Sequence, residues 1–213
     1  MMKPLIFCTS LMLEESLHKY AMWWKYYRTK FPEAHLIIAN DGPIEGHVFD
    51  KFMSLTDGEF EISNLVVFEE KLGRDWHYHW GWWRSFLTVL RYGKQNEFSK
   101  IIHIESDAVI LSKRLFNFII NENNGWKCLF TKKYNFPESA IQIINPDSFY
   151  LIDNLPEQFS FDTIAELFLP FKAVKNFIGD RYGENCTLPS HKIDYVCQWD
   201  WMWQIEKEWI IDD

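Results

Sequence analysis

The chain has 213 residues, a length that a single domain accounts for and that suffices for a sizeable hydrophobic core. Hydrophobic residues make up 47% and charged residues 24%, a composition that excludes a disordered chain, and the longest apolar run (residues 20–24) is far too short to cross a membrane. Acidic residues outnumber basic ones by 30 to 22, and this net charge of −8 argues against a nucleic-acid-binding protein.

The N-terminus and the cysteines both indicate a cytoplasmic protein. The first ten residues carry one positive charge and no small-x-small cleavage site, so we interpret them as a strand and not as a signal peptide. The four cysteines show no CxxC spacing, which is typical of reduced core thiols in a cytosol-like compartment.

The first half of the chain alternates apolar runs with helical periodicity. The run 5–10 predicts a strand, and the spacing of apolar residues over 13–31 predicts a helix, with acidic residues near its start and basic ones near its end. Further strands are predicted over 35–39 and 64–68, with a helix over 44–56 between them. A polar and aromatic segment (69–82) precedes a helix predicted over 82–95.

The second half continues the alternation. Strands are predicted over 100–104, 108–111, 127–131 and 140–144, with a helix before 123–125. Helices are predicted over 148–154, over 162–178 with a bend at Pro170, and over 196–210. This order predicts an α/β fold in one domain (1–213) whose mixed, mostly parallel sheet is flanked by helices. The abrupt end at Asp213 is also compatible with the N-terminal domain of a longer protein.

The ends of the predicted strands carry the residues of most chemical interest, because ligands of such sheets bind beyond the carboxyl ends of the strands. The sharpest feature is Glu105-Ser106-Asp107, between two apolar runs. Carboxylates at positions i and i+2 of an extended chain point the same way, and a bound Mg²⁺ or Mn²⁺ would relieve their repulsion and bridge to a diphosphate. The alternative is an ordinary polar turn, where Asp and Ser are common.

An apolar strand, an acid-x-acid triplet and a short apolar strand, about 100 residues after an N-terminal strand, resemble the DxD motif of GT-A glycosyltransferases. The whole chain is similar to the small GT-A domains encoded by chlorella-infecting viruses. The resemblance implies a Rossmann-like GT-A domain that transfers a hexose from a UDP-sugar donor to a glycan acceptor with the help of Mn²⁺ or Mg²⁺. It places the protein in the host-cell cytoplasm if the chain is viral.

The same resemblance implies roles for single residues at the metal and the nucleotide. Asp107 would be a metal ligand with a catalytic effect, and Glu105, which stands where the family has Asp, the less secure ligand. His191 would be a third ligand, which favours a retaining enzyme; a histidine on a surface loop is the alternative. Nucleotide contacts are implied for Thr9, Ser10, Asp41, Arg84, Ser106 and Lys192, with turn chemistry or a solvated helix charge as the alternatives.

Catalytic and acceptor roles fall on later residues and on the aromatic segment. Asp162, at the start of the predicted helix 162–178, takes the place of a catalytic or acceptor-binding acid, with an ordinary N-cap as the alternative. Gln142 would lie under the transferred sugar. Trp76 and His79 are the expected acceptor contacts, since aromatic rings stack on sugar faces, although they also fill protein cores.

Two other functions stay open at this stage. A nucleotidyltransferase has a similar sheet, but it would need a glycine-rich phosphate loop after the first strand, and residues 9–13 contain no glycine. A non-catalytic sugar-binding module would explain the 11 tryptophans, yet it would not need the acidic triplet. The sequence gives no indication of the oligomeric state.

Overall fold

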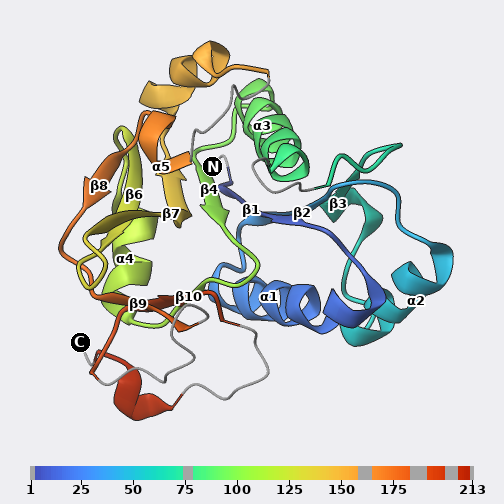
Figure 1. Cartoon of the computed structure of the whole chain (residues 1–213), viewed down its shortest axis with the longest axis horizontal. Helices are drawn as coiled ribbons and strands as arrows, with labels where there is room; N and C mark the ends of the chain where they lie inside the picture. Colours follow the sequence, from blue (N-terminus) through green and yellow to red (C-terminus); the bar gives the residue numbers. More distant parts are fainter. Residues whose placement is uncertain (1–2, 74–78, 158–164, 183–190, 200–205, 212–213) are drawn as a thin grey trace.

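The computed structural model describes residues 3–73, 79–157, 165–182, 191–199 and 206–211, and a seven-stranded sheet forms its centre (Figure 1). The strand order is β3-β2-β1-β4-β7-β6-β8, and the four strands from β3 to β4 run parallel, whereas β7 is antiparallel to both of its neighbours. The strands are β1 (Leu5–Ser10), β2 (His35–Asn40), β3 (Leu65–Val67), β4 (Ile101–Ile104), β6 (Trp126–Thr131), β7 (Phe136–Ile144) and β8 (Lys172–Val174).

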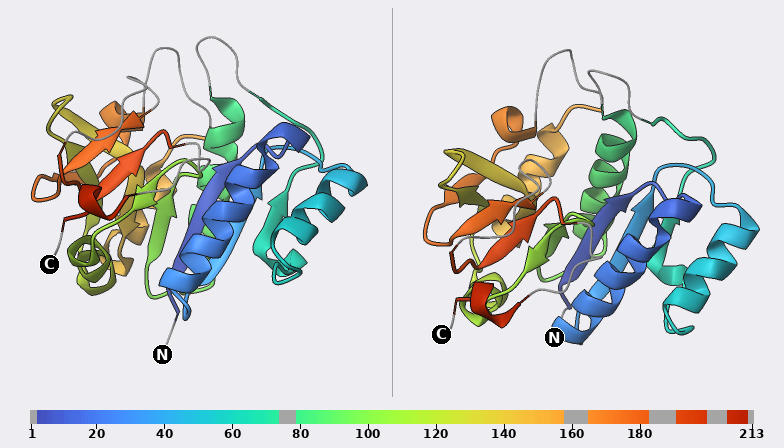
Figure 2. Two further views of the ribbon diagram at one scale, coloured as in Figure 1. Left: turned by 90° about the horizontal axis from the view of Figure 1, so that it is seen from below. Right: turned by 60° about the horizontal axis from the view of Figure 1, so that its bottom comes forward.

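Helices cover both faces of this sheet (Figures 1 and 2). One face packs against α1 (Leu17–Lys30), α2 (Gly46–Leu55) and α4 (Lys113–Asn121), and the other against α3 (Trp80–Gln95), α5 (Ala165–Phe168) and the 3₁₀ helix Pro146–Asn154. Alternate residues of β1 point to opposite faces, so Ile6 lies in the first core and Phe7 in the second. Because both faces are covered, β1 is buried along its whole length and is apolar up to Cys8.

A second, three-stranded sheet joins the C-terminal part of the chain to the acidic triplet. Its order is β5-β10-β9, with β5 (Val109–Ile110), β9 (Gly179–Arg181) and β10 (Tyr195–Cys197). The backbone N–H of Trp199, two residues after β10, donates a hydrogen bond of 2.8 Å to the carbonyl oxygen of Asp107. Residues about 90 positions apart in the sequence therefore meet at the end of β4.

The expected α/β fold is confirmed, and the elements expected up to residue 144 are found with small shifts at their ends. The segment expected as a helix over 148–154 is a 3₁₀ helix. Three short 3₁₀ helices, Glu14–Ser16, Ile62–Asn64 and Lys207–Trp209, complete the elements of the described residues. Within this described part, no helix has both the length and the hydrophobicity that crossing a bilayer requires.

Two predicted helices are wrong. Where a helix was predicted over 162–178, the described residues form only α5, because Pro170 ends it and the chain continues as β8, which pairs with β6. The helix predicted over 196–210 is also absent at its start, where β10 pairs with β5 and β9. All three residues of β10 are buried, as expected for the central strand of a sheet. An amphipathic helix would expose some of three consecutive residues.

Candidate functional site

A cavity of about 260 Å³ opens beyond the carboxyl ends of β1, β2 and β4, where a parallel sheet places its ligands. Each of these three strand ends contributes residues to it. The lining residues are Thr9, Ser10, Leu11, Tyr20, Asp41, Gly73, His79, Trp82, Glu105, Ser106 and Asp107.

The acidic triplet forms a tight turn at one wall of this cavity. The N–H of Glu105 donates to the carbonyl of Ala140 on β7 (2.8 Å), and the N–H of Ala108 donates back to the carbonyl of Glu105 (3.0 Å). These bonds fix the backbone on both sides of Ser106, so the turn presents its carboxylates to the cavity. The indole N–H of Trp82 on α3 donates to the Glu105 carboxylate at 3.2 Å.

Carboxyl groups outnumber cations around the triplet. Burial, together with the neighbouring carboxyl groups of Asp107, Glu138 and Glu166, raises the pKa of Glu105 to about 8. Burial also raises the pKa of Asp107, while the positive charges of Lys19 and Arg181 act in the opposite direction. Four carboxyl groups therefore meet two cations, and a divalent cation would stabilise the ionised forms of Glu105 and Asp107, which burial disfavours.

The donor set fits a hard divalent cation. Two carboxylates beside an open cavity leave coordination positions for water and phosphate oxygens, which is how Mg²⁺ and Mn²⁺ are commonly held. Within the described residues, no group of three or more His, Cys, Asp or Glu side chains is placed to hold a metal ion. His191, the predicted third ligand, is exposed and does not line the cavity.

Asp41 and Arg84 fasten the rim of the cavity. The Asp41 carboxylate accepts hydrogen bonds from the backbone N–H groups of Leu72 (3.2 Å) and Gly73 (2.7 Å) and from the Arg84 guanidinium. The guanidinium also donates to the carbonyl of Glu70 and lies 4.0 Å from the centroid of the Phe68 ring. Arg84, predicted to face a diphosphate, does not line the cavity, and its guanidinium is engaged by Asp41, Glu70 and Phe68.

The start of α3 is fitted to this arrangement. A Cβ atom on Gly81 would lie 1.9 Å from a carboxylate oxygen of Asp41, so only glycine permits α3 to approach β2 this closely. His79, the N-cap of α3, and Trp82, in its first turn, are thereby brought to the cavity wall.

The wall made by residues 9–13 is held by side chains from β2 and α1. The amide oxygen of Asn40 accepts from the Ser10 hydroxyl (3.2 Å) and from the N–H of Met12 (2.6 Å). The Tyr20 hydroxyl accepts from the N–H of Leu11 at 3.0 Å, and Tyr20 itself lines the cavity. The polar ends of β1 and β2 are thus mutually satisfied and form a pre-shaped pocket.

Gln142 lies in the interior and away from this cavity. Its amide oxygen accepts from the indole N–H of Trp126 (2.9 Å), and its amide nitrogen donates to the carbonyl of Ser139 (2.8 Å). The side chain is fully buried and is not among the lining residues. The structure therefore does not bring it together with the acidic triplet at the cavity surface.

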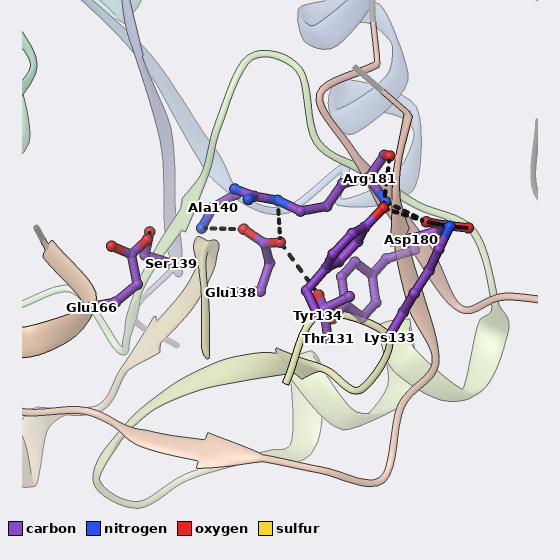
Figure 3. A network of polar contacts seen from close by, with 10 residues as sticks. Thr131, Lys133, Tyr134, Glu138, Ser139, Ala140, Glu166, Asp180 and Arg181 are labelled. Carbon is purple, nitrogen blue, oxygen red and sulfur yellow. Dashed lines mark hydrogen bonds and ion pairs between the residues drawn. The ribbon is translucent and has the colours of Figure 1, made fainter. Parts of the chain in front are cut away.

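An irregular part of β7 carries a polar network behind the triplet (Figure 3). Residues 139–141 have no partner on β6, because the pairing jumps from Cys128–Gln142 to Leu129–Glu138, and such bulges re-aim side chains. Glu138 is 1% exposed; its carboxylate lies 3.1 Å from Nε of Arg181 and accepts from the Thr131 hydroxyl at 3.3 Å. Burial raises the pKa of Glu138 to about 7, against the opposing effect of Arg181.

Of the other predicted residues, Lys192 is exposed and does not line the cavity, while Asp162 and Trp76 lie outside the described residues. The sequence did not indicate Tyr20, Gly73, Glu138 or Arg181. None of these residues belongs to a recognisable sequence motif. Their positions depend on the packing of α1, the hydrogen bonds to Asp41 and the bulge of β7.

Comparison with known proteins identifies the fold. No family model and no curated protein matches the sequence. Among solved structures, the chain is similar to a glycosyltransferase involved in the glycosylation of the major capsid of PBCV-1, with a TM-score of 0.51, 7% identity and 92% of each chain covered. It is also similar to the galactosyltransferase LgtC in complex with donor and acceptor sugar analogs, with a TM-score of 0.54, 8% identity, and 91% of this chain and 86% of that one covered. The chain therefore has the GT-A fold, as the acidic triplet led us to expect.

Proposed function

We propose that the protein is a glycosyltransferase that takes its sugar from a nucleoside-diphosphate donor bound in the cavity. The observation that carries the proposal is the position of Glu105 and Asp107, which line a cavity at the strand ends of a GT-A fold. A fold by itself does not imply a function, so the argument depends on this site and not on the likeness alone.

The walls of the cavity suit the two ends of such a donor. Thr9 and Ser10 offer hydroxyl groups at the end of β1, and the Asp41 clamp holds the backbone of Gly73 at the rim, so this part suits the nucleoside. The acidic triplet, whose Glu105 accepts from the indole of Trp82, lines the same cavity beyond the end of β4 and suits the diphosphate and the sugar. The resemblance to UDP-sugar enzymes makes a UDP-hexose our first choice of donor and a glycan hydroxyl our choice of acceptor.

Glu105 and Asp107 would hold Mn²⁺ or Mg²⁺. When bound, such an ion neutralises the negative charge that develops on a departing diphosphate. Asp107 is the stronger candidate, since the indole of Trp82 already occupies one oxygen of Glu105. The retaining course expected from His191 stays a prediction, which the anomeric configuration of the product will test.

A donor screen tests the proposal. The protein is incubated with Mn²⁺ and a panel of nucleotide sugars, with and without mixed oligosaccharide acceptors, and the released nucleoside diphosphate is measured. We expect release from one nucleotide sugar, stimulated by acceptor and abolished by a chelator. Release from none of the panel, together with retained binding of free oligosaccharides, would favour a non-catalytic sugar-binding module.

A further inference from the structure

Glu105 must be held in one orientation if it is to bind a metal ion well. A glutamate side chain has one more rotatable bond than an aspartate, so fixing its carboxylate costs more conformational entropy. In the structure, this carboxylate accepts a hydrogen bond from the indole N–H of Trp82 at 3.2 Å. Both residues line the cavity, so the indole acts on a carboxylate that a ligand can reach.

The ring of Trp82 is itself held by the core of the protein. It stacks on Phe86, one turn later on α3, with ring centroids 4.9 Å apart and an angle of 11° between the ring planes. The ring of His103 on β4 meets it edge-on, with centroids 6.0 Å apart and an angle of 73°. Phe86 and His103 are both fully buried, so the indole N–H has its direction before any ligand binds.

The backbone at the start of α3 fixes the same residue from the other end. Trp82 follows Gly81, whose close approach to the Asp41 carboxylate leaves no room for a Cβ atom. Trp83, the next residue, has a different partner: its indole N–H donates to the carbonyl of Pro156 at 3.0 Å, and it does not line the cavity. Of these two neighbouring tryptophans, Trp82 is therefore the one that reaches the acidic triplet.

We infer that Trp82 is a positioning residue, which holds one oxygen of Glu105 so that the other oxygen is available to the metal ion. This inference rests on the proposed function. Carboxylates that bind metal ions are commonly oriented by a hydrogen bond from a second residue, and loss of that partner weakens metal binding. The indole thus compensates for the longer side chain of Glu105, which binds the ion through a single oxygen.

The test measures the affinity for Mn²⁺ without nucleotide, from the paramagnetic resonance signal of the free ion. Trp82→Phe removes the indole N–H and keeps a ring that can stack on Phe86, and we expect the Kd of Mn²⁺ to rise by roughly 10- to 100-fold. Trp83→Phe is the matched control, because it removes the same group one residue further along α3, and its Kd should equal that of the wild type. Glu105→Gln should raise the Kd by itself, and adding Trp82→Phe to it should change the Kd little, since Trp82 acts through Glu105.

A second measurement uses the wild-type protein, so it does not depend on the stability of any variant. In protein made with isotope-labelled tryptophan, nuclear magnetic resonance detects each indole N–H separately. Saturating Mg²⁺, which is diamagnetic, should shift the assigned indole resonance of Trp82 and leave that of Trp83 in place, because only the first N–H is bonded to a ligand of the ion.

An unchanged or lower Kd of Mn²⁺ in Trp82→Phe would overturn the inference, since the indole would then be idle or would compete with the ion. An equal loss of affinity whether or not Glu105 is replaced would also overturn it, because Trp82 would then support the site only in general, and so would a Trp82 resonance that Mg²⁺ does not move. Absence of Mn²⁺ binding in the wild type would overturn it as well, and the donor screen then decides the proposed function separately.

Discussion

At the scale of single residues, the carboxylates around the cavity differ in their partners and therefore in what they can do. Asp41 is surrounded by hydrogen-bond donors and acts as a clamp. Glu138 is sealed in the interior with Arg181. Glu105 and Asp107 line the cavity, so they are the two that a ligand can reach.

The pH dependence of stability should report the burial of Glu138. Its pKa is about 7 in the folded protein against 4.5 for the ordinary group, so its contribution to stability is fully present below about pH 4.5 and is lost as the pH rises through 7. Glu138→Gln should therefore become more stable relative to the wild type between these pH values, by on the order of 3 kcal/mol. Urea denaturation at a series of pH values measures this difference.

The exposed Glu33 supplies the control Glu33→Gln, whose stability should follow the wild type at every pH. A Glu138→Gln protein that instead loses stability relative to the wild type as the pH rises would contradict our reading. That result would mean that the ion pair with Arg181 outweighs the burial of the carboxylate.

Apart from His79, at the N-cap of α3, the cavity-lining residues that the sequence indicated are those that end strands. Thr9, Ser10, Asp41 and the acidic triplet converge because the carboxyl ends of parallel strands meet at one edge of the sheet, a rule that needs only the strand positions. The engagement of Arg84 could not be foreseen. It depends on the carbonyl of Glu70 and the ring of Phe68, and a side chain's partners across a loop leave no periodic pattern in the sequence.

At the scale of elements, α4 shows how a buried charge can hold a helix. Its first turn is capped by the Ser112 hydroxyl, which accepts from the N–H of Leu115 at 3.3 Å. The last turn of α4 contains no basic residue of its own. The positive charge at this end of the helix comes from Lys100, just before β4. Lys100 is only 9% exposed. Its ammonium group donates to the carbonyls of Ile119 (2.9 Å), Ile120 (2.8 Å) and Glu122.

Lys100→Met should lower the free energy of unfolding by about 1.5–3 kcal/mol, since it removes charged hydrogen bonds from the carbonyl end of a helix. Lys113→Met changes an exposed lysine in the first turn of the same helix, where a positive charge opposes the helix dipole, and should be neutral or slightly stabilising. Chemical denaturation of both variants measures the effect. Equal losses in the two would show that Lys100 is not a cap.

The two mispredicted helices lie in the same part of the chain, after residue 160. Up to β7, the strands β1, β2, β3 and β5 are each followed by a helix with clear periodicity, so local pattern and fold agree there. Beyond it, β8, β9 and β10 are three residues each and are defined by pairing with distant partners such as β6 and β5. A strand of three residues is too short to show the alternation of apolar and polar residues that predicts a strand. The spacing of the aromatic residues in this part of the sequence instead resembled the apolar face of a helix.

At the scale of the whole molecule, the site is a junction of the two sheets. The seven-stranded sheet supplies the strand ends that line the cavity, and the segment after β10 of the three-stranded sheet holds the acidic triplet through the bond from the Trp199 N–H to the Asp107 carbonyl. Arg181, opposite Cys197 in this second sheet, brings its positive charge towards the same place. The chain must therefore fold as a whole before the triplet acquires its surroundings.

The most direct test of the central claim is the Mn²⁺-dependent affinity for UDP in Asp107→Asn and in the wild type. Asparagine keeps the shape of the side chain and removes a charge that burial disfavours, so the melting temperature without ligand should not fall. In the wild type, UDP with Mn²⁺ at 100 times its Kd should stabilise the fold by about 2.7 kcal/mol, and Asp107→Asn should lose this gain. Asp153→Asn, at an exposed ion pair with Lys94, should keep it. Undiminished Mn²⁺-dependent UDP binding in Asp107→Asn would contradict the account.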